Sequence, residues 1–279
     1  MSARPSPLVS TAWLAERLGS PRLKVVDATW FLPGQGDFHA AFRAAHIPGA
    51  VHFDIDAIAD HANPLPHMLP SAEAFAEAVG ALGVASDDTV VTYGMAGPRV
   101  WWSFRVMGHD AVHVLDGGLA KWVAEGRAIE AGEPHPEPQT FAAHFRPELV
   151  ADLETVRQAL AEGRPVLDAR PAESFTGEAA EPRAGLRGGH MPGAESLPSS
   201  TLFAADGTFQ PKAHLAALLG RMDREAAVAT CGSGVAACAI ALAQAELGRW
   251  DTAVYDGSWT EWGGRTDTDV ATSSMSSRP

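Results

Sequence analysis

The sequence predicts an α/β protein of two similar domains in tandem, each with a parallel sheet that helices cover on both faces. Two observations support this prediction: a long internal repeat, and short apolar runs that alternate with helical patterns inside each copy. Parallel strands that are buried on both faces read as continuous apolar runs, and helices connect them. The length of 279 residues agrees with two domains of ordinary size.

Three motifs of the first half return in the second half in the same order. VVDA at 25–28 returns as VLDA at 166–169, HIPGA at 46–50 as HMPGA at 190–194, and VLDG at 114–117 as VYDG at 254–257. The spacing of about 140 residues is the length of a whole domain, which indicates a gene duplication. We expect domains at residues 1–133 and 148–279, joined by the proline-rich linker 134–147.

The expected elements follow the same pattern in both halves. Buried strands are predicted at residues 24–28, 89–93 and 111–115 in the first half, and at 165–169, 226–230 and 252–255 in the second. Ser71 is a typical helix N-cap, and residues 82–83 end that helix. A second helix is expected at about 235–247. The tail from residue 266 is rich in Ser and Thr and is expected to fray.

Composition excludes several classes of protein. The net charge of −13 is divided almost evenly between the halves, with no basic tail, which argues against nucleic acid and anionic membranes as partners. With 46% hydrophobic and 20% charged residues, the chain does not belong to the disordered class. Two cysteines cannot build a disulfide framework, the N-terminal residues lack a secretory pattern, and the longest apolar run, at 235–243, is about half a membrane span. We therefore expect a cytoplasmic protein.

One cysteine lies where chemistry is expected. Cys231 follows the apolar run 226–230 and precedes Gly232, Gly234 and a helical pattern, which places it at the carboxyl edge of a parallel sheet. The glycines let backbone N–H groups turn toward one point, and with the helix N-terminus they form a site that stabilises a thiolate. We interpret Cys231 as a nucleophile, against the alternative of a buried structural cysteine. Cys238 is predicted to pack in the core, and a resolving or redox-sensing thiol is the alternative for it.

Phosphatases of the tyrosine-phosphatase type also carry a cysteine on such a loop. They use Cys-x5-Arg, because the arginine binds phosphate through two hydrogen bonds. The corresponding position in this chain is Ala237. The loop has no fixed cation for a dianion, so phosphate-monoester chemistry is disfavoured.

The loop CGSGV at 231–235 resembles the tandem-domain sulfurtransferases of the rhodanese superfamily, in the 3-mercaptopyruvate branch, whose loop reads CGSGVTA. The thiosulfate branch has basic residues after the cysteine. The resemblance extends from about residue 8 to 264 and includes the segments 46–50, 53–56, 67–70, 101–105 and 255–263. Ala236 departs from the family's usual threonine. The first half has Tyr93-Gly94-Met95 where the second has Cys231-Gly232-Ser233, so that half is expected to be catalytically silent.

The resemblance implies a reaction and its participants. A thiolate at Cys231 would attack the sulfur of 3-mercaptopyruvate, release pyruvate and keep a persulfide, which a thiol or cyanide acceptor then takes. Thioredoxin is one candidate acceptor. Arg183 and Arg187 are implied to bind the substrate's carboxylate and carbonyl, and the loop residues Gly232, Gly234 and Val235 to line the substrate site. No cofactor and no metal site are expected.

The resemblance also implies a proton relay of Ser233, His46 and Asp37. An imidazole that a carboxylate orients can move a proton through a hydroxyl. His190 occupies the same motif as His46, however, so a shared structural role could explain both histidines. Two alternatives to the main hypothesis remain: a thiosulfate sulfurtransferase, and a non-enzymatic module that carries a persulfide to a partner.

Overall fold

A computed structural model describes residues 4–32, 34–220 and 227–272. The chain divides into two compact units. The first unit comprises Met1–His61, Leu69–Arg146 and Phe203–Gln210, and the second comprises Ala62–Met68, Pro147–Leu202 and Pro211–Pro279. Each unit therefore takes a short segment from the other half of the sequence. The contiguous bounds 1–133 and 148–279 do not include this exchange and remain a prediction.

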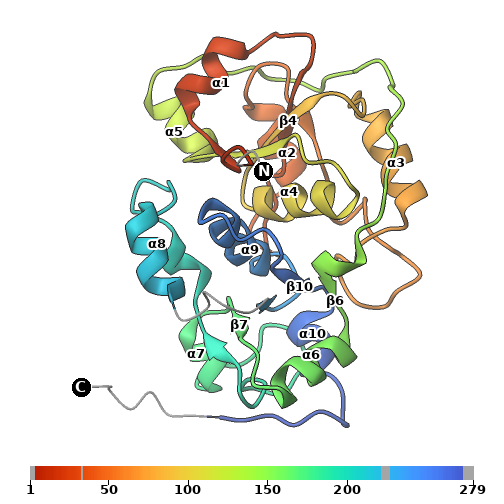
Figure 1. The fold of residues 1–279 in the computed structure, drawn as a ribbon. Coiled ribbons are helices and arrows are strands. Elements are labelled where there is room, and N and C mark those ends of the chain that lie inside the picture. The colour runs from red at the N-terminus through yellow and green to blue at the C-terminus, as the bar shows by residue number, and fades with distance from the viewer. Residues whose placement is uncertain (1–3, 33, 221–226, 273–279) are drawn as a thin grey trace. The chain divides into compact units, whose positions relative to one another are not determined.

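The first unit is built on a five-stranded parallel sheet in the order β1-β5-β4-β2-β3. Figure 1 labels its central strand, β4, and the five helices of this unit, α1 to α5. Its strands are β1 Leu8–Val9, β2 Leu23–Asp27, β3 Val51–His52, β4 Thr89–Tyr93 and β5 Val112–Leu115. Its helices are α1 Thr11–Arg17, α2 Phe38–Ala44, α3 Ala72–Ala81, α4 Gly97–Val106 and α5 Gly118–Ala124. The parallel pairing of every strand confirms the predicted fold class for this half.

The second unit repeats this architecture with the order β6-β10-β9-β7-β8. Its strands are β6 Val150–Ala151, β7 Val166–Asp168, β8 Glu195–Ser196, β9 Val228–Thr230 and β10 Ala253–Tyr255. Its helices are α6 Leu153–Ala161, α7 Ala172–Thr176, α8 Lys212–Leu219, α9 Ala237–Glu246 and α10 Ser258–Trp262, with 3-10 turns at η1 Pro147–Leu149 and η2 Ser199–Leu202. Each strand has a counterpart at the same place in the first sheet, so the sequence repeat is a structural repeat.

Local signals gave the elements to within a few residues. Ser71 caps α3, because its side chain accepts a hydrogen bond from the amide of Ala74. The helix expected at 235–247 begins later, at Ala237, because residues 231–236 form a loop. The short outer strands were not predicted, since two residues carry no periodic pattern. Within the described ranges, no helix is both long and apolar enough to cross a bilayer.

The expected fraying of the tail is wrong for its described part, which ends at residue 272. Thr268 is buried, the indole Nε1 of Trp262 donates to the carbonyl of Asp269 at 2.8 Å, and Ala271 pairs with His190 in an antiparallel bridge. These tertiary contacts hold the segment in place, although its polar composition predicts fraying. Residues 273–279 lie outside the described residues.

The core of the second unit reaches directly to α10. Trp259 is fully buried and Trp262 is 4% exposed, and both pack with Val166, Val228 and Tyr255. Two large aromatic side chains therefore fix one face of this five-residue helix. The site described next depends on this anchoring.

Candidate active site

Cys231 lies at the end of a central strand. It follows β9, which lies between β10 and β7, and the ladder places Thr230 opposite Asp168. Cys231 is therefore at the carboxyl edge of the parallel sheet, where α/β proteins place their sites. Its side chain is buried at 3% exposure, and the loop 231–236 connects it to α9.

A serine supports the cysteine loop from α10. The Ser258 hydroxyl accepts hydrogen bonds from the amides of Cys231 at 3.2 Å and Gly234 at 3.1 Å, and donates to the carbonyl of Tyr255 at 2.7 Å. Ser258 has a φ of +48° and is fully buried. A non-glycine residue in this left-handed region is uncommon. Sequence reasoning missed Ser258, and the only signal was its place directly after the repeated motif VYDG.

The first residues of α10 also hold the other side of the loop. The amide of Trp259 donates to the carbonyl of Cys231 at 2.9 Å. Thr260 donates to the carbonyl of Gly232 twice, from its amide at 2.9 Å and from its hydroxyl at 2.6 Å. The N-terminal end of α10 therefore binds two consecutive loop carbonyls, and the loop has one defined shape.

The loop keeps a set of amide groups uncommitted. Across the described residues, no hydrogen bond is donated by the amides of Gly232, Ser233, Val235 and Ala236. These four N–H groups belong to the turn that begins at Cys231 and leads into the N-terminus of α9. Unpaired donors concentrated on one turn are suited to bind an anion, such as a thiolate or a persulfide.

Arg183 lies beside the loop. Its guanidinium Nη2 donates to the hydroxyl of Ser233 at 3.3 Å, and its Nη1 would be 3.7 Å from a Cβ placed on Gly232. The only hydrogen bond of Arg183 among the described residues is this long one, so most of its donors are available to a substrate. A guanidinium binds a carboxylate through two parallel hydrogen bonds.

A buried ion network fixes the segment that carries Arg183. The Arg170 guanidinium donates to both carboxylate oxygens of Asp168, to Glu181 at 2.7 Å and to the carbonyl of Gly189 at 2.8 Å. Burial raises the pKa of Glu181 despite the charge of Arg170. Because Glu181 is two residues before Arg183, this network fixes the backbone just before Arg183. Sequence reasoning did not identify Arg170.

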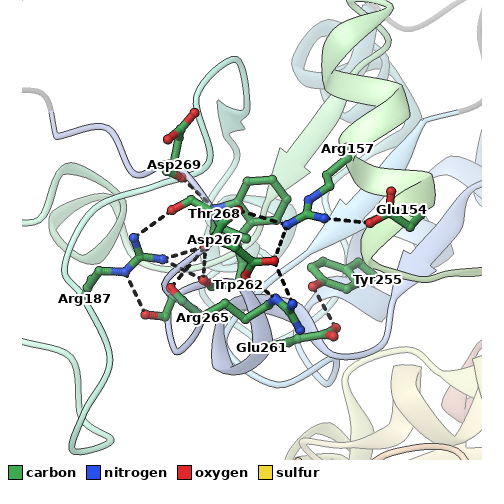
Figure 2. Close-up of polar contacts among 11 residues, drawn as sticks. Glu154, Arg157, Arg187, Tyr255, Glu261, Trp262, Arg265, Asp267, Thr268 and Asp269 are labelled. Carbon is green, nitrogen blue, oxygen red and sulfur yellow. Dashed lines mark hydrogen bonds and ion pairs between the residues drawn. The ribbon is translucent and has the colours of Figure 1, made fainter.

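Arg187 does not join Arg183 at the loop. Its guanidinium donates to the carbonyls of Gly263 at 3.1 Å, Trp262 at 3.0 Å and Thr268 at 2.8 Å, and to the Thr268 hydroxyl at 2.6 Å (Figure 2). All three guanidinium nitrogens are therefore occupied by the chain itself. In this structure Arg187 therefore contacts other parts of the chain, because spacing on a glycine-rich loop does not fix where a side chain points, and its expected role as a substrate ligand remains a prediction.

His46 and His190 pack in the same way. The Nδ1 of His46 donates to the carbonyl of Phe42 at 2.8 Å, and the ring stacks on Phe42 at 4.3 Å. The Nδ1 of His190 donates to the carbonyl of Phe175 at 2.8 Å, and the ring stacks on Phe175 at 3.8 Å. The shared motif therefore has a shared packing role. In each ring this leaves Nε2 as the nitrogen that can accept a proton.

The structure does not bring Asp37 to His46. Asp37 is the N-cap of α2, where its carboxylate accepts from the amide of Ala40 at 2.9 Å, and this hydrogen bond lowers the pKa of Asp37. His46 lies beyond the other end of α2, a helix of seven residues and about 10 Å. The carbonyl of Phe42, and not the carboxylate of Asp37, orients the imidazole.

The equivalent turn of the first unit has no room for a nucleophile. The ladder places Tyr93 opposite Asp27, as Thr230 is opposite Asp168, so Gly94 occupies the place of Cys231. The sequence alone had suggested Tyr93 as the counterpart of Cys231, and the structure moves this counterpart by one residue, to Gly94. Gly94 has a φ of +94°, and a Cβ there would lie 2.5 Å from the amide nitrogen of Thr29.

Comparisons with known proteins agree with this geometry. The profile of the family described as rhodanese-like domain matches residues 10–125 and 152–265. The chain is similar to 3-mercaptopyruvate sulfurtransferase of Mus musculus, with 41% identity over 91% of each chain, and to thiosulfate sulfurtransferase of Bos taurus, with 40% identity over 91% of each chain.

A crystal structure is similar over the same range. That structure is SseA of Escherichia coli, described as a 3-mercaptopyruvate sulfotransferase. It matches with a TM-score of 0.82 and 36% identity, over 91% of this chain and 99% of the other. The two matched domains, the shared fold and the identity to these relatives show that the chain belongs to the rhodanese family and carries two rhodanese-like domains in tandem.

Proposed function

We propose that the protein is a sulfurtransferase that moves sulfane sulfur from 3-mercaptopyruvate, through a persulfide on Cys231, to a thiol or cyanide acceptor. Two features of the described residues carry this proposal: Cys231 begins a loop in which four amides donate no hydrogen bond, and the guanidinium of Arg183 lies beside that loop. The first supplies a site for a sulfur anion, and the second supplies a site for a carboxylate. The names of the relatives support the same reaction.

The chemistry follows from these groups. The thiolate of Cys231 attacks the thiol sulfur of the substrate, and the carbon–sulfur bond breaks with its electron pair on the methylene carbon. The carbon takes the proton that the substrate's thiol loses, so pyruvate leaves and a persulfide anion remains. An acceptor thiolate then attacks the outer sulfur and restores the Cys231 thiolate. The loop amides stabilise each anion on sulfur, and their arrangement is built before the substrate arrives.

Ser233 is suited to move the proton. Its hydroxyl accepts from Arg183, so its own proton is free to be donated. His46 as the partner base is part of the proposal, with its orientation set by the carbonyl of Phe42 in place of Asp37. Because Gly94 leaves no room for a side chain, we assign the catalytic step to the second unit and none to the first.

Donor preference follows from charge. Gly232 and Ser233 are neutral, so the loop offers amides and one guanidinium, which suits a monoanionic carboxylate better than the thiosulfate dianion. Thiosulfate sulfurtransferase is the second candidate, since a relative of that name has 40% identity. A cytoplasmic location and thioredoxin as acceptor remain predictions from the sequence.

Steady-state turnover tests the proposal. Pyruvate release from 3-mercaptopyruvate and sulfite release from thiosulfate are measured on one preparation of the wild type and of Cys231→Ser, with a thiol acceptor present. We expect higher kcat/KM for 3-mercaptopyruvate and loss of both activities in Cys231→Ser. Higher kcat/KM for thiosulfate would favour the second candidate. No turnover with either donor would contradict a catalytic function.

A further inference from the structure

Arg187 closes the C-terminal end of α10. The carbonyls of Trp262 and Gly263 at this end have no partner inside the helix, and the guanidinium donates to both. It also donates to the carbonyl and the hydroxyl of Thr268, which ties the following segment to the helix end (Figure 2). The Thr268 hydroxyl also donates to the carbonyl of Trp262 at 2.6 Å, so Arg187 and Thr268 together fix where α10 stops and where the chain continues.

The N-terminal end of the same helix holds the cysteine loop. Ser258 accepts from the amides of Cys231 and Gly234, and the amides of Trp259 and Thr260 donate to loop carbonyls. Only five residues, about 7.5 Å of helix, separate the Arg187 end from the loop end. A helix this short has little stability of its own, so its contacts determine its position.

A second contact couples Arg187 to Trp259, the second residue of α10. The indole Nε1 of Trp259 donates to the carbonyl of Arg187 at 3.0 Å, and the guanidinium of Arg170 lies 4.1 Å from the Trp259 ring centroid. Gly263 allows this close packing, because a Cβ there would lie 2.6 Å from Trp259 Nε1. Backbone and side chain of Arg187 thus bind the same helix at two places.

In the first unit, Arg43 occupies the position of Arg187 but, among the described residues, does not bind the end of a helix in this way. Arg43 is three residues before His46, as Arg187 is three residues before His190. The guanidinium of Arg43 is half-exposed and pairs with Glu133 at 3.2 Å. The same motif position therefore carries a surface ion pair in one unit and a helix-end clamp in the other.

We infer that Arg187 is a positioning residue that sets the geometry of the Cys231 loop through α10. This inference rests on the proposed function of the loop. Without the clamp, α10 can tilt. Ser258, which accepts from two loop amides, and Thr260, which donates to a loop carbonyl, then no longer hold the loop in one arrangement. The loss acts on the thiolate and the persulfide, so it affects every sulfur donor alike.

The test compares Arg187→Met with Arg187→Lys, and uses Arg43→Met as the matched control. The kcat and KM values are measured for 3-mercaptopyruvate and thiosulfate. The rate of Cys231 alkylation by iodoacetamide, which needs no donor, is measured in a Cys238→Ser background. For Arg187→Met we expect kcat/KM to fall about tenfold or more with both donors, mainly in kcat, and alkylation to slow. Arg187→Lys should recover part of this loss, and Arg43→Met should behave like the wild type.

Two results would overturn the inference. A rise in KM for 3-mercaptopyruvate alone would make Arg187 a substrate ligand. Unchanged kinetics and alkylation in Arg187→Met, with only a lower melting temperature, would make its role purely structural. If Arg187→Met does not fold, Thr268→Val is measured in the same way, since it removes the hydroxyl that accepts from Arg187 and donates to the carbonyl of Trp262. A wild type that lacks turnover but alkylates normally would count against the proposed function, while the alkylation comparison would still decide the role of Arg187.

Discussion

The two units have equivalent central strands, and they differ in the loop that follows this strand. In the first unit three residues separate β4 from α4, whereas in the second unit six residues separate β9 from α9. In the short turn the amide of Ala96 donates to the carbonyl of Ala28, and within the described residues the amides of Gly94 and Met95 donate no hydrogen bond. By the same measure, the longer loop has four amides that donate no hydrogen bond, against two in the short turn. Loop length, as much as the cysteine, therefore distinguishes the turn of the first unit from the candidate site.

The support under the loop differs in the same way. Ser258 in the second unit has a φ of +48°, and Gly118, which follows the equivalent motif in the first unit, has a φ of +55°. The backbone turns alike in both, but only the second unit places a hydroxyl there. The candidate site therefore differs from the equivalent turn by its cysteine, a longer loop and one added hydroxyl, while the order of the strands in the sheet is the same.

The largest effect is expected from an attempt to copy the nucleophile. Gly94→Cys places a side chain 2.5 Å from the amide nitrogen of Thr29, in a left-handed backbone conformation that alone costs roughly 1–3 kcal/mol. We expect a clear loss in the free energy of unfolding, measured by urea denaturation. No sulfur transfer should return when this variant is combined with Cys231→Ser. Recovered turnover in the double variant would show that the first unit can be catalytic.

A smaller but selective effect is expected at Arg183. Loss of a hydrogen bond to a charged group costs about 1.5–3 kcal/mol, so Arg183→Ala should lower kcat/KM for 3-mercaptopyruvate by about 10- to 150-fold. Thiosulfate has no carboxylate and should be affected less. An equal loss with both donors would mean that Arg183 shapes the loop and does not bind the substrate's carboxylate.

The support from Ser258 is tested by a pair of variants. Ser258→Ala leaves two loop amides without their acceptor, and we expect turnover with both donors to fall about tenfold. Ser258→Gly removes the same hydroxyl but suits the φ of +48°, so it should unfold at a higher temperature than Ser258→Ala with the same kinetic loss. If both variants keep full turnover, the hydroxyl does not set the loop geometry.

The smallest effect is expected at Asp37. Its pKa is lowered in the folded state, so its stabilising contribution is present above the unfolded value and is lost as pH falls below about 4. Asp37→Asn should flatten this part of the melting temperature profile between pH 2.5 and 6. Turnover at neutral pH should stay near that of the wild type. The matched control is Asp152→Asn, the N-cap of α6. A large loss of turnover in Asp37→Asn alone would return Asp37 to the proton relay.

The sequence was sufficient for the fold and for the placement of Cys231, because apolar runs, glycines and helix patterns are local signals. The residues that support the cysteine loop could not be predicted from the sequence, and the reason is physical. Ser258 reaches Cys231 across 27 residues through a tertiary hydrogen bond, and no spacing rule encodes it. Arg183 and Arg187 share one segment but point to different partners. Gly94 was misaligned by one residue, because the two loops differ in length.

The central claim is that Cys231 carries the transferred sulfur. Intact-mass measurement and peptide mapping after treatment with 3-mercaptopyruvate alone test it directly. We expect one adduct of about 32 Da, on the peptide that contains Cys231, in the wild type and in Cys238→Ser, and none in Cys231→Ser. An adduct that persists in Cys231→Ser or maps to Cys238, or pyruvate release without any adduct, would contradict the account.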